Sequence, residues 1–196
     1  LHDGELVTDE GCAVISTAFG ELLFYTDGIT VYNKNHQIMA NGTGLAGNPS
    51  STQSALILPM PGSSTIYYVF TVTAFGGGGG MKYSIVDMDL NGGLGDVTDM
   101  KNVSIQSPVC EKLTAVRKKN EAGFWIIGHG FTGLFSDTGG NFYSYSLTSA
   151  GLNMTPVVST TGTVINGLLY RTMGYLKVSP NGKKMVSANY GLITEV

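Results

Sequence analysis

Strand-like segments dominate this sequence, and they predict an all-β fold. No segment of ten or more residues combines helical periodicity with capping residues. Charged residues make up only 13% of the chain, and 28 residues are glycine, a composition with many turns and few helices. The strands also recur in groups of roughly 45–55 residues, the size of a four-stranded blade. The sequence therefore predicts part of a β-propeller made of four-stranded antiparallel blades.

The first predicted unit spans residues 1–40. Its strands are expected at 12–17, 21–26 and 29–33, and the pairs Phe19-Gly20 and Asp27-Gly28 form the turns between them. Residues 41–52 have no hydrophobic periodicity and form a polar loop.

The second and third units share one layout. In the second unit, 53–106, strands are expected at 54–58, 66–73, 83–88 and 103–105. In the third unit, 111–162, they are expected at 112–117, 124–128, 142–147 and 157–159. The second strand of each unit (IYYVFTV, FWIIGH) is almost continuously apolar, as expected when neighbouring blades cover both faces.

The last unit, 174–196, contains expected strands at 175–178 and 184–189, and the chain stops in the middle of a hairpin. The 1–196 chain therefore reads as about three and a half blades of one partial propeller. Between two strands of the second unit lies a run of five glycines at 76–80, expected to be a flexible hairpin tip. A strand, not a helix, follows the glycines, which argues against a phosphate-binding loop.

Several segments together resemble one protein family. They are EGCAVIS, LLFYTDGITVYNKN, MANGTGL, STQSALILP, YYVFTV, YSIVDM, NGGLGDVTDMKNV, EKLTAV, FWIIGH, YSLTSAGLN and GYLKVSPNGKKM. The succession resembles the N-terminal WD40-like β-propeller region of large Bacteroidota surface proteins, the gliding-motility-associated cargo of type IX secretion. The resemblance implies a seven-bladed ring, secretion and display on the outer membrane exterior. It supplies no catalytic residue, and it marks the glycine run and residues 131–140 as loop insertions.

Composition limits the partners. The net charge is −3, and the only basic cluster, Arg117-Lys118-Lys119, reads as a solvated turn, so no nucleic-acid partner is expected. No apolar run approaches the roughly 20 residues that span a bilayer, so no membrane span is expected. The chain starts with Leu1 and has no signal peptide, which suggests a piece of a longer product. Because an open blade array exposes strand edges, we expect missing blades or a partner chain to cover them.

The best metal candidate is the segment containing Asp87, Asp89 and Asn91, followed by Gly92. Oxygen ligands at alternate positions followed by glycine match the first half of a calcium loop. The twelfth position of that pattern is Thr98 instead of glutamate. A solvated strand end explains the same residues without calcium, and no other cofactor is expected.

Three other polar positions have a structural and a functional interpretation. His129 ends a buried strand and is expected to form a structural hydrogen bond or part of a binding rim, because no nucleophile motif accompanies it. Glu10 and Glu111 recur at the start of successive units, which suggests a role in blade entry. Asp27 is explained by its Asp-Gly turn.

The aromatic residues are expected mainly to pack inside blades, and a few at loop mouths could contact a ligand. They are Tyr25, Tyr67, Tyr68, Trp125, Tyr143, Tyr145 and Tyr175. Cys12 and Cys110 are expected to be buried thiols, with a disulfide as the alternative in an oxidising compartment.

The function expected from these observations is a non-catalytic interaction or adhesion module of a secreted or cell-surface bacterial protein. Its loops would bind a protein or a glycan. One alternative is a glycan-acting propeller enzyme, which needs two facing carboxylates. The other is a structural subunit of a surface filament or secretion assembly.

Overall fold

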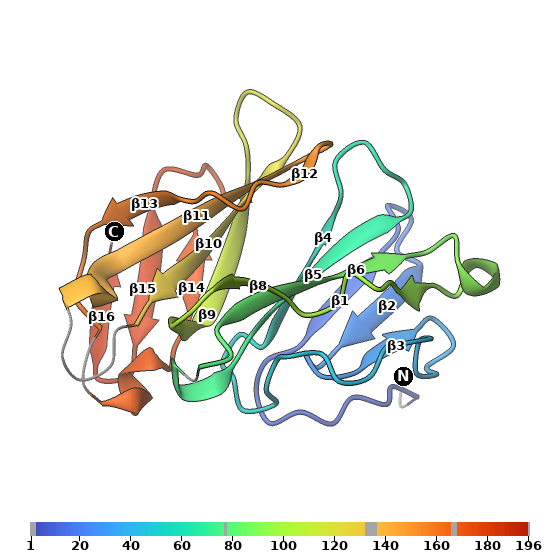
Figure 1. The fold of residues 1–196 in the computed structure, drawn as a ribbon, viewed down its shortest axis with the longest axis horizontal. Coiled ribbons are helices and arrows are strands. Elements are labelled where there is room, and N and C mark those ends of the chain that lie inside the picture. Colours follow the sequence, from blue (N-terminus) through green and yellow to red (C-terminus); the bar gives the residue numbers. More distant parts are fainter. Residues whose placement is uncertain (1–2, 77, 132–136, 166–167, 196) are drawn as a thin grey trace.

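The computed structural model describes residues 3–76, 78–131, 137–165 and 168–195. Within these ranges the chain forms strands and short 3₁₀ turns but no α-helix, so the all-β prediction is confirmed. The strands lie in four antiparallel sheets that follow one another along the chain (Figure 1).

The first sheet has the order β1-β2-β3, with β1 at Ala13–Ser16, β2 at Leu22–Thr26 and β3 at Val31–Asn33. Its second turn depends on Asp27, whose Oδ1 accepts the backbone N–H groups of Ile29 at 2.8 Å and Thr30 at 2.7 Å. The Asp-Gly turn expected from the sequence is therefore confirmed.

The second and third sheets share one topology, in which the third strand carries two short partners on its outer edge. The second sheet consists of β4 (Ala55–Pro59), β5 (Ile66–Val72), β6 (Met81–Asp87), β7 (Asp96–Val97) and β8 (Val103–Gln106). The third consists of β9 (Val109–Arg117), β10 (Phe124–Gly130), β11 (Asn141–Thr148), β12 (Gly151–Leu152) and β13 (Val157–Thr160).

The fourth sheet has the order β14-β15-β16, at Leu176–Val178, Met185–Asn189 and Leu192–Glu195. The expectation that the chain stops in the middle of a hairpin is wrong, because Ala188 pairs with Ile193 and the β15–β16 hairpin is formed. Short 3₁₀ turns occupy Ala74–Gly76 (η1), Asn91–Gly93 (η2), Asp137–Gly140 (η3) and Leu169–Thr172 (η4).

The glycine run lies in the connection of the β5–β6 hairpin, in which Val72 is opposite Met81. The hairpin predicted there is confirmed, and a strand follows the glycines as expected. Gly77 and residues 132–136, which fall in the two expected loop insertions, lie outside the described residues.

The hydrophobic core lies between successive sheets. Phe70 and Val69 are neighbours on β5 and point to opposite faces, yet both are fully buried. Phe70 packs with Tyr83 and Ile126 toward the third sheet, while Val69 belongs to a second cluster shared with the first sheet. The prediction that this strand is covered on both faces is confirmed.

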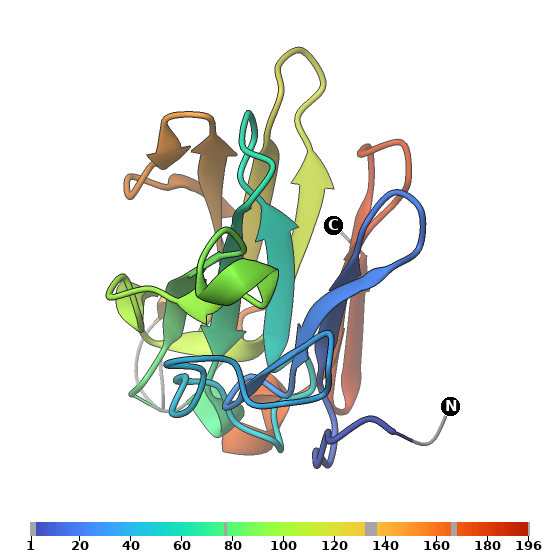
Figure 2. The ribbon, with the colours of Figure 1, turned by 90° about the vertical axis from the view of Figure 1, so that its right-hand side faces the viewer.

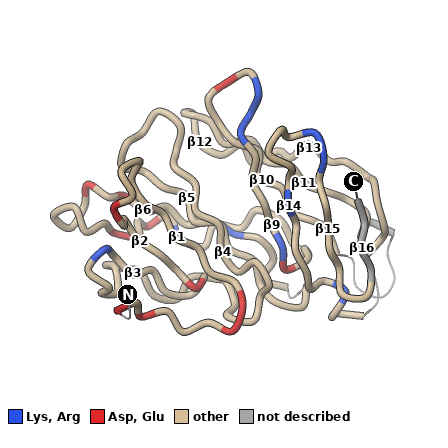
Figure 3. The backbone as a smooth tube through the Cα atoms, turned by 180° about the vertical axis from the view of Figure 1, so that it is seen from behind, with Lys and Arg blue, Asp and Glu red and all other residues tan. Residues whose placement is uncertain are grey.

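The first strands of the four sheets lie side by side. β1, β4, β9 and β14 each form one edge of their sheet, and they pack in this order, β1 on β4, β4 on β9 and β9 on β14. Figure 3 shows them in the middle of the molecule, between β3 on one side and β15 on the other. Within the described residues the sheets do not close into a ring.

Gln53, two residues before β4, connects three sheets. Its backbone N–H donates to the carbonyl of Glu111 at 3.2 Å. Its side chain accepts the N–H of Leu176 at 2.7 Å and donates to the carbonyl of the same residue at 3.4 Å. A glutamine amide therefore takes the place of a neighbouring strand at the start of β14.

Candidate functional site

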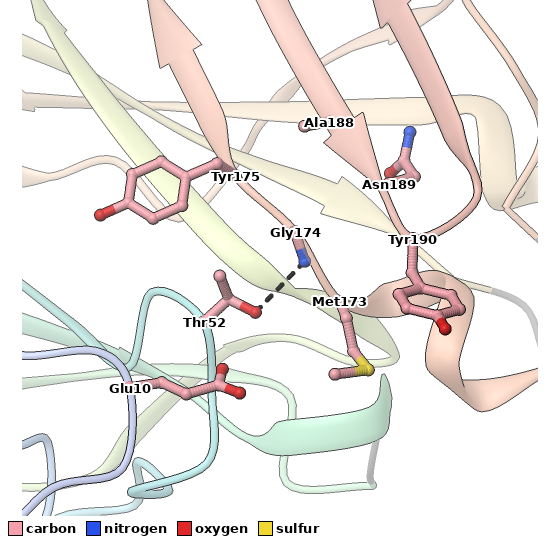
Figure 4. Close-up of a pocket in the computed structure, with 8 residues that line it drawn as sticks. All are labelled: Glu10, Thr52, Met173, Gly174, Tyr175, Ala188, Asn189 and Tyr190. Atoms are coloured by element: carbon pink, nitrogen blue, oxygen red, sulfur yellow. Dashed lines mark hydrogen bonds between the residues drawn. The ribbon is translucent and has the colours of Figure 1, made fainter.

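The segments that enter three of the sheets converge on one cavity. Glu10, Thr52 and Met173 each lie three positions before the first residue of β1, β4 and β14, respectively. The cavity has a volume of about 480 Å³ and opens to solvent. Its lining, drawn in Figure 4, comprises Glu10, Thr52, Met173, Gly174, Tyr175, Ala188, Asn189 and Tyr190. We call it the entry cavity.

The entry cavity has an aromatic rim and few polar groups. Tyr175 and Tyr190 are 54% and 62% exposed, and Figure 4 shows them on opposite sides of Gly174. Tyr170 packs edge-on against Tyr190, with ring centroids 5.3 Å apart. The hydroxyl of Thr52 accepts the N–H of Gly174 at 3.2 Å, which joins the two walls. Exposed tyrosines held in this way suit contact with a sugar ring or a peptide.

Glu111 lies on β9 close to the entry cavity but does not line it. The residue is fully buried, and the backbone groups of Thr52 and Phe75 that approach its carboxyl oxygens are not aligned well enough to form regular hydrogen bonds. Burial and the nearby carboxylate of Glu10 raise the pKa of Glu111 to about 7. The backbone of Thr52, the ammonium of Lys112 and the backbone of Phe75 oppose this shift.

Lys112, the next residue on β9, is also fully buried. Its ammonium donates to the carbonyl of Ala188 at 2.8 Å, to the carbonyl of Met173 at 3.4 Å and to Oδ1 of Asn189. Burial lowers the pKa of Lys112 to about 8. All three donors of the ammonium are therefore used to join the third sheet to the fourth.

His129 on β10 is 1% exposed, so the interpretation as part of a binding rim is wrong and the structural interpretation fits. Its ring stacks on Phe142 with centroids 4.1 Å apart, and Nδ1 lies 3.4 Å from the hydroxyl of Ser187 on β15. Burial and the charge of Lys112 lower the pKa of His129 to about 4, so the imidazole is neutral at pH 7.

These residues form a buried polar layer between the third and fourth sheets, beside the entry cavity. The structure brings Glu10, before β1 of the first sheet, close to Glu111 on β9 of the third sheet. It leaves Glu10 exposed at the cavity and Glu111 closed off from it. The two carboxylates consequently do not face each other across the cavity. The expected role of these two residues in blade entry stays a prediction.

The calcium candidate lies far from this layer, at the end of β6. Oδ1 of Asp87 accepts the backbone N–H of Asp89 at 3.0 Å, and Asn91 begins the turn η2 with a φ of 51°. Asp87 is paired with Asp96 across β6 and β7, and one carboxyl oxygen of Asp96 is buried without a partner. The described residues contain no cluster of three or more acidic, histidine or cysteine side chains suited to a metal. Calcium binding at this turn stays a prediction.

A second hollow lies at the other end of β14, between the β9–β10 and β14–β15 loops. It has a volume of about 720 Å³, and its lining includes Trp125, Arg117, Lys119 and Lys183. The side chain of Lys118 is not solvated, contrary to the expectation for the basic cluster. Its ammonium lies 4.5 Å from the centre of the Trp125 ring and pairs with Glu121. We call this hollow the tryptophan groove.

The other aromatic positions mostly agree with the packing interpretation. Tyr25, Tyr68 and Tyr145 are buried, and Tyr67 and Tyr143 are partly buried within their sheets. Trp125 and Tyr175 are the two that reach a cavity.

The two cysteines are free thiols. Cys110 is buried as expected, and Cys12 is exposed, so the prediction of burial is wrong for Cys12. Cys12 lies one residue before β1, where the strand has not yet entered the core.

Several cavity residues escaped sequence reasoning, above all Thr52, Asn189 and Tyr190. Thr52 lies three residues before β4, Asn189 ends β15 and Tyr190 follows it, so the three residues share no local sequence signal. None of the described helical turns is long and apolar enough to cross a bilayer.

Comparison of the chain with protein-family models, characterised proteins and solved structures finds no match.

Proposed function

We propose that this chain is part of a β-propeller and acts as a non-catalytic interaction or adhesion module of a secreted or cell-surface protein. The observation that carries the proposal is the convergence of Glu10, Thr52 and Met173 on one open cavity from equivalent positions of three sheets. Loops presented at one end of a rigid β-scaffold commonly form its binding surface.

The sheet arrangement supports the propeller. The first strand of each antiparallel sheet, which forms the edge of that sheet, lies in the middle of the molecule (Figure 3). These first strands pack against one another in chain order. Figure 2 shows the first and fourth sheets on the same side of the molecule. In the proposed ring, further blades or a partner chain lie between these two sheets. The sequence resemblance supports surface display through type IX secretion.

The ligand of the entry cavity is proposed to be a protein or a glycan that contacts Tyr175 and Tyr190. The titratable groups beside the cavity favour binding over catalysis. Lys112 uses its whole ammonium to join two sheets, and His129 is covered by Phe142 and Ser187. Neither group reaches the cavity surface.

A glycan-acting enzyme is the second candidate, because one specific observation favours it. Burial and the nearby carboxylate of Glu10 raise the pKa of Glu111 to about 7, which suits a general acid near neutral pH. Paired carboxylates of this kind act as acid and nucleophile or base in glycosidases. The burial of Glu111 away from the cavity is the argument against this role.

The proposal is tested with the chain 1–196 immobilised and exposed to an array of neutral oligosaccharides and to a random dodecapeptide library. We expect retention of a ligand by the unmodified chain and by the control Phe19→Ala, which removes an exposed aromatic ring from the β1–β2 turn. The double substitution Tyr175→Ala, Tyr190→Ala should abolish retention. Equal retention by the double variant would contradict a role for the entry cavity. Shortened oligosaccharides in the eluate would favour the enzyme instead.

A further inference from the structure

The tryptophan groove is distinct from the entry cavity. β14 runs from one to the other, since Gly174 and Tyr175 line the entry cavity and Val178 and Ser179 line the groove. The floor of the groove is apolar and includes Val116, Trp125 and Val178. Its walls are the β9–β10 loop and the turn 179–183.

The walls of the groove carry uncompensated positive charge. Lys119 and Lys183 are exposed, and neither forms an ion pair with a described residue. The guanidinium of Arg117 lies 5.4 Å from the centre of the Phe124 ring, on the opposite face of the sheet from Trp125. The acidic residue of the β9–β10 loop, Glu121, is paired with Lys118. Figure 3 shows blue segments on both loops at this end of the molecule. This concentration of cations is notable in a chain whose net charge is −3.

Trp125 lies where three hollows meet. Besides the groove, it lines a hollow beside the β9–β10 loop and an apolar hollow of about 230 Å³ with Ile127 and Val157. The ammonium of Lys118 lies 4.5 Å from the centre of the indole ring and is paired with Glu121, so this pair adds no net charge to the groove. An aromatic floor therefore lies between walls of one charge sign.

We propose that the tryptophan groove binds an acidic polysaccharide through its carboxylate or sulfate groups. Sugar rings present apolar C–H faces that suit the floor of Val116, Trp125 and Val178, while their anionic groups suit Lys119 and Lys183. A cleft lined by one sign of charge also concentrates oppositely charged ligands. This inference is independent of the entry cavity, because the two sites share no lining residue.

A nucleic acid fits the groove less well. It needs a basic stripe along its backbone, whereas the cations here are confined to two loops of an acidic chain. An acidic peptide would satisfy the walls but has no sugar face for the aromatic floor.

The test uses the fluorescence of Trp125, the single tryptophan of the chain. A galacturonic-acid hexasaccharide and a chondroitin sulfate hexasaccharide are titrated into the chain 1–196, with maltohexaose, poly-glutamate and single-stranded DNA as comparison probes. We expect a saturable change in emission with at least one acidic hexasaccharide and none with maltohexaose. Raising NaCl from 0.05 to 0.5 M should weaken binding about tenfold, because the contacts are exposed charges.

Two matched variants locate the site. Lys183→Gln should weaken binding about fivefold, the effect of one exposed charge pair, whereas Lys34→Gln removes an equal charge from the first sheet and should leave binding unchanged. Equal affinity of these variants, or no emission change with either acidic hexasaccharide, would overturn the proposal. Preference for poly-glutamate or DNA would also overturn it and assign the groove to that ligand.

Discussion

The ammonium of Lys112 on β9 donates a hydrogen bond of 2.8 Å to the backbone carbonyl of Ala188 on β15. This bond crosses from the third sheet to the fourth at a point where no strand pairing connects them. Together with the contacts to Met173 and Asn189, it makes one lysine the main polar link between these sheets.

Substitution of this lysine should weaken the whole chain. Lys112→Met keeps the apolar stem but removes the donor to the carbonyls of Ala188 and Met173 and to Oδ1 of Asn189, which should cost about 2–4 kcal/mol of unfolding free energy. Urea unfolding followed by circular dichroism measures this loss. The control Lys177→Met changes an exposed lysine of β14 and should cost less than about 0.5 kcal/mol. Equal midpoints for the two variants would show that the buried ammonium contributes nothing.

Protonation of the buried Glu111 should make the protein more stable at pH 5 than at pH 8. Its pKa is raised from 4.5 to about 7, so its contribution to stability is fully present below pH 4.5 and is lost as the pH rises through 7. Glu111→Gln keeps the group neutral throughout, and its advantage over the unmodified chain should therefore grow from pH 5 to pH 8. Thermal unfolding at both pH values measures the difference. An advantage that is the same at pH 5 and pH 8 would contradict the raised pKa.

His129 should have the opposite effect. Its pKa is lowered from 6.5 to about 4, so its contribution is present above pH 6.5 and is lost as the pH falls toward 4. Near pH 5.5 each group changes stability by about 1 kcal/mol per pH unit, with opposite signs. The unmodified chain should therefore show little pH dependence there, whereas Glu111→Gln should lose stability on acidification and His129→Gln should gain it. Parallel pH profiles for the two variants would refute this assignment.

The two thiols should differ in reactivity. Cys12 is exposed, whereas Cys110 is buried, donates to the carbonyl of Gly130 at 3.4 Å and has a pKa raised to about 12 by burial. Iodoacetamide at pH 8 should modify Cys12 in the folded chain and both cysteines in urea, as mass spectrometry of the peptides would show. Modification of Cys110 in the folded chain, or of neither residue in urea without a reductant, would contradict the structure.

The strands were predictable from local pattern. The apolar run of β5, with Gly62 before it and the glycine run 76–80 after it, predicts both the strand and its burial. β7 and β12 have two residues each, too few for any periodicity, and they form only because β6 and β11 offer a free edge.

The sites were much less predictable, because their partners are distant in sequence. Lys112 contacts residues 61–77 positions away, and nothing in the strand around it indicates which carbonyls it meets. From the sequence alone Lys118 is predicted to be solvated, because nothing in its neighbours indicates that its ammonium lies over the ring of Trp125. Glu10 precedes β1 and Glu111 lies near the start of β9, but the burial that separates the two carboxylates depends on the packing of the sheets.

The two hydrogen bonds between Gln53 and Leu176 also affect how this fold can change by mutation. Strand pairing depends on the backbone, so most substitutions preserve it. The link at the start of β14 depends on a side-chain amide, and one nucleotide change can turn glutamine into glutamate. A glutamate still accepts the N–H of Leu176 but cannot donate to its carbonyl. A change in one codon can therefore weaken the link between Gln53 and the start of β14 while leaving every strand pairing intact.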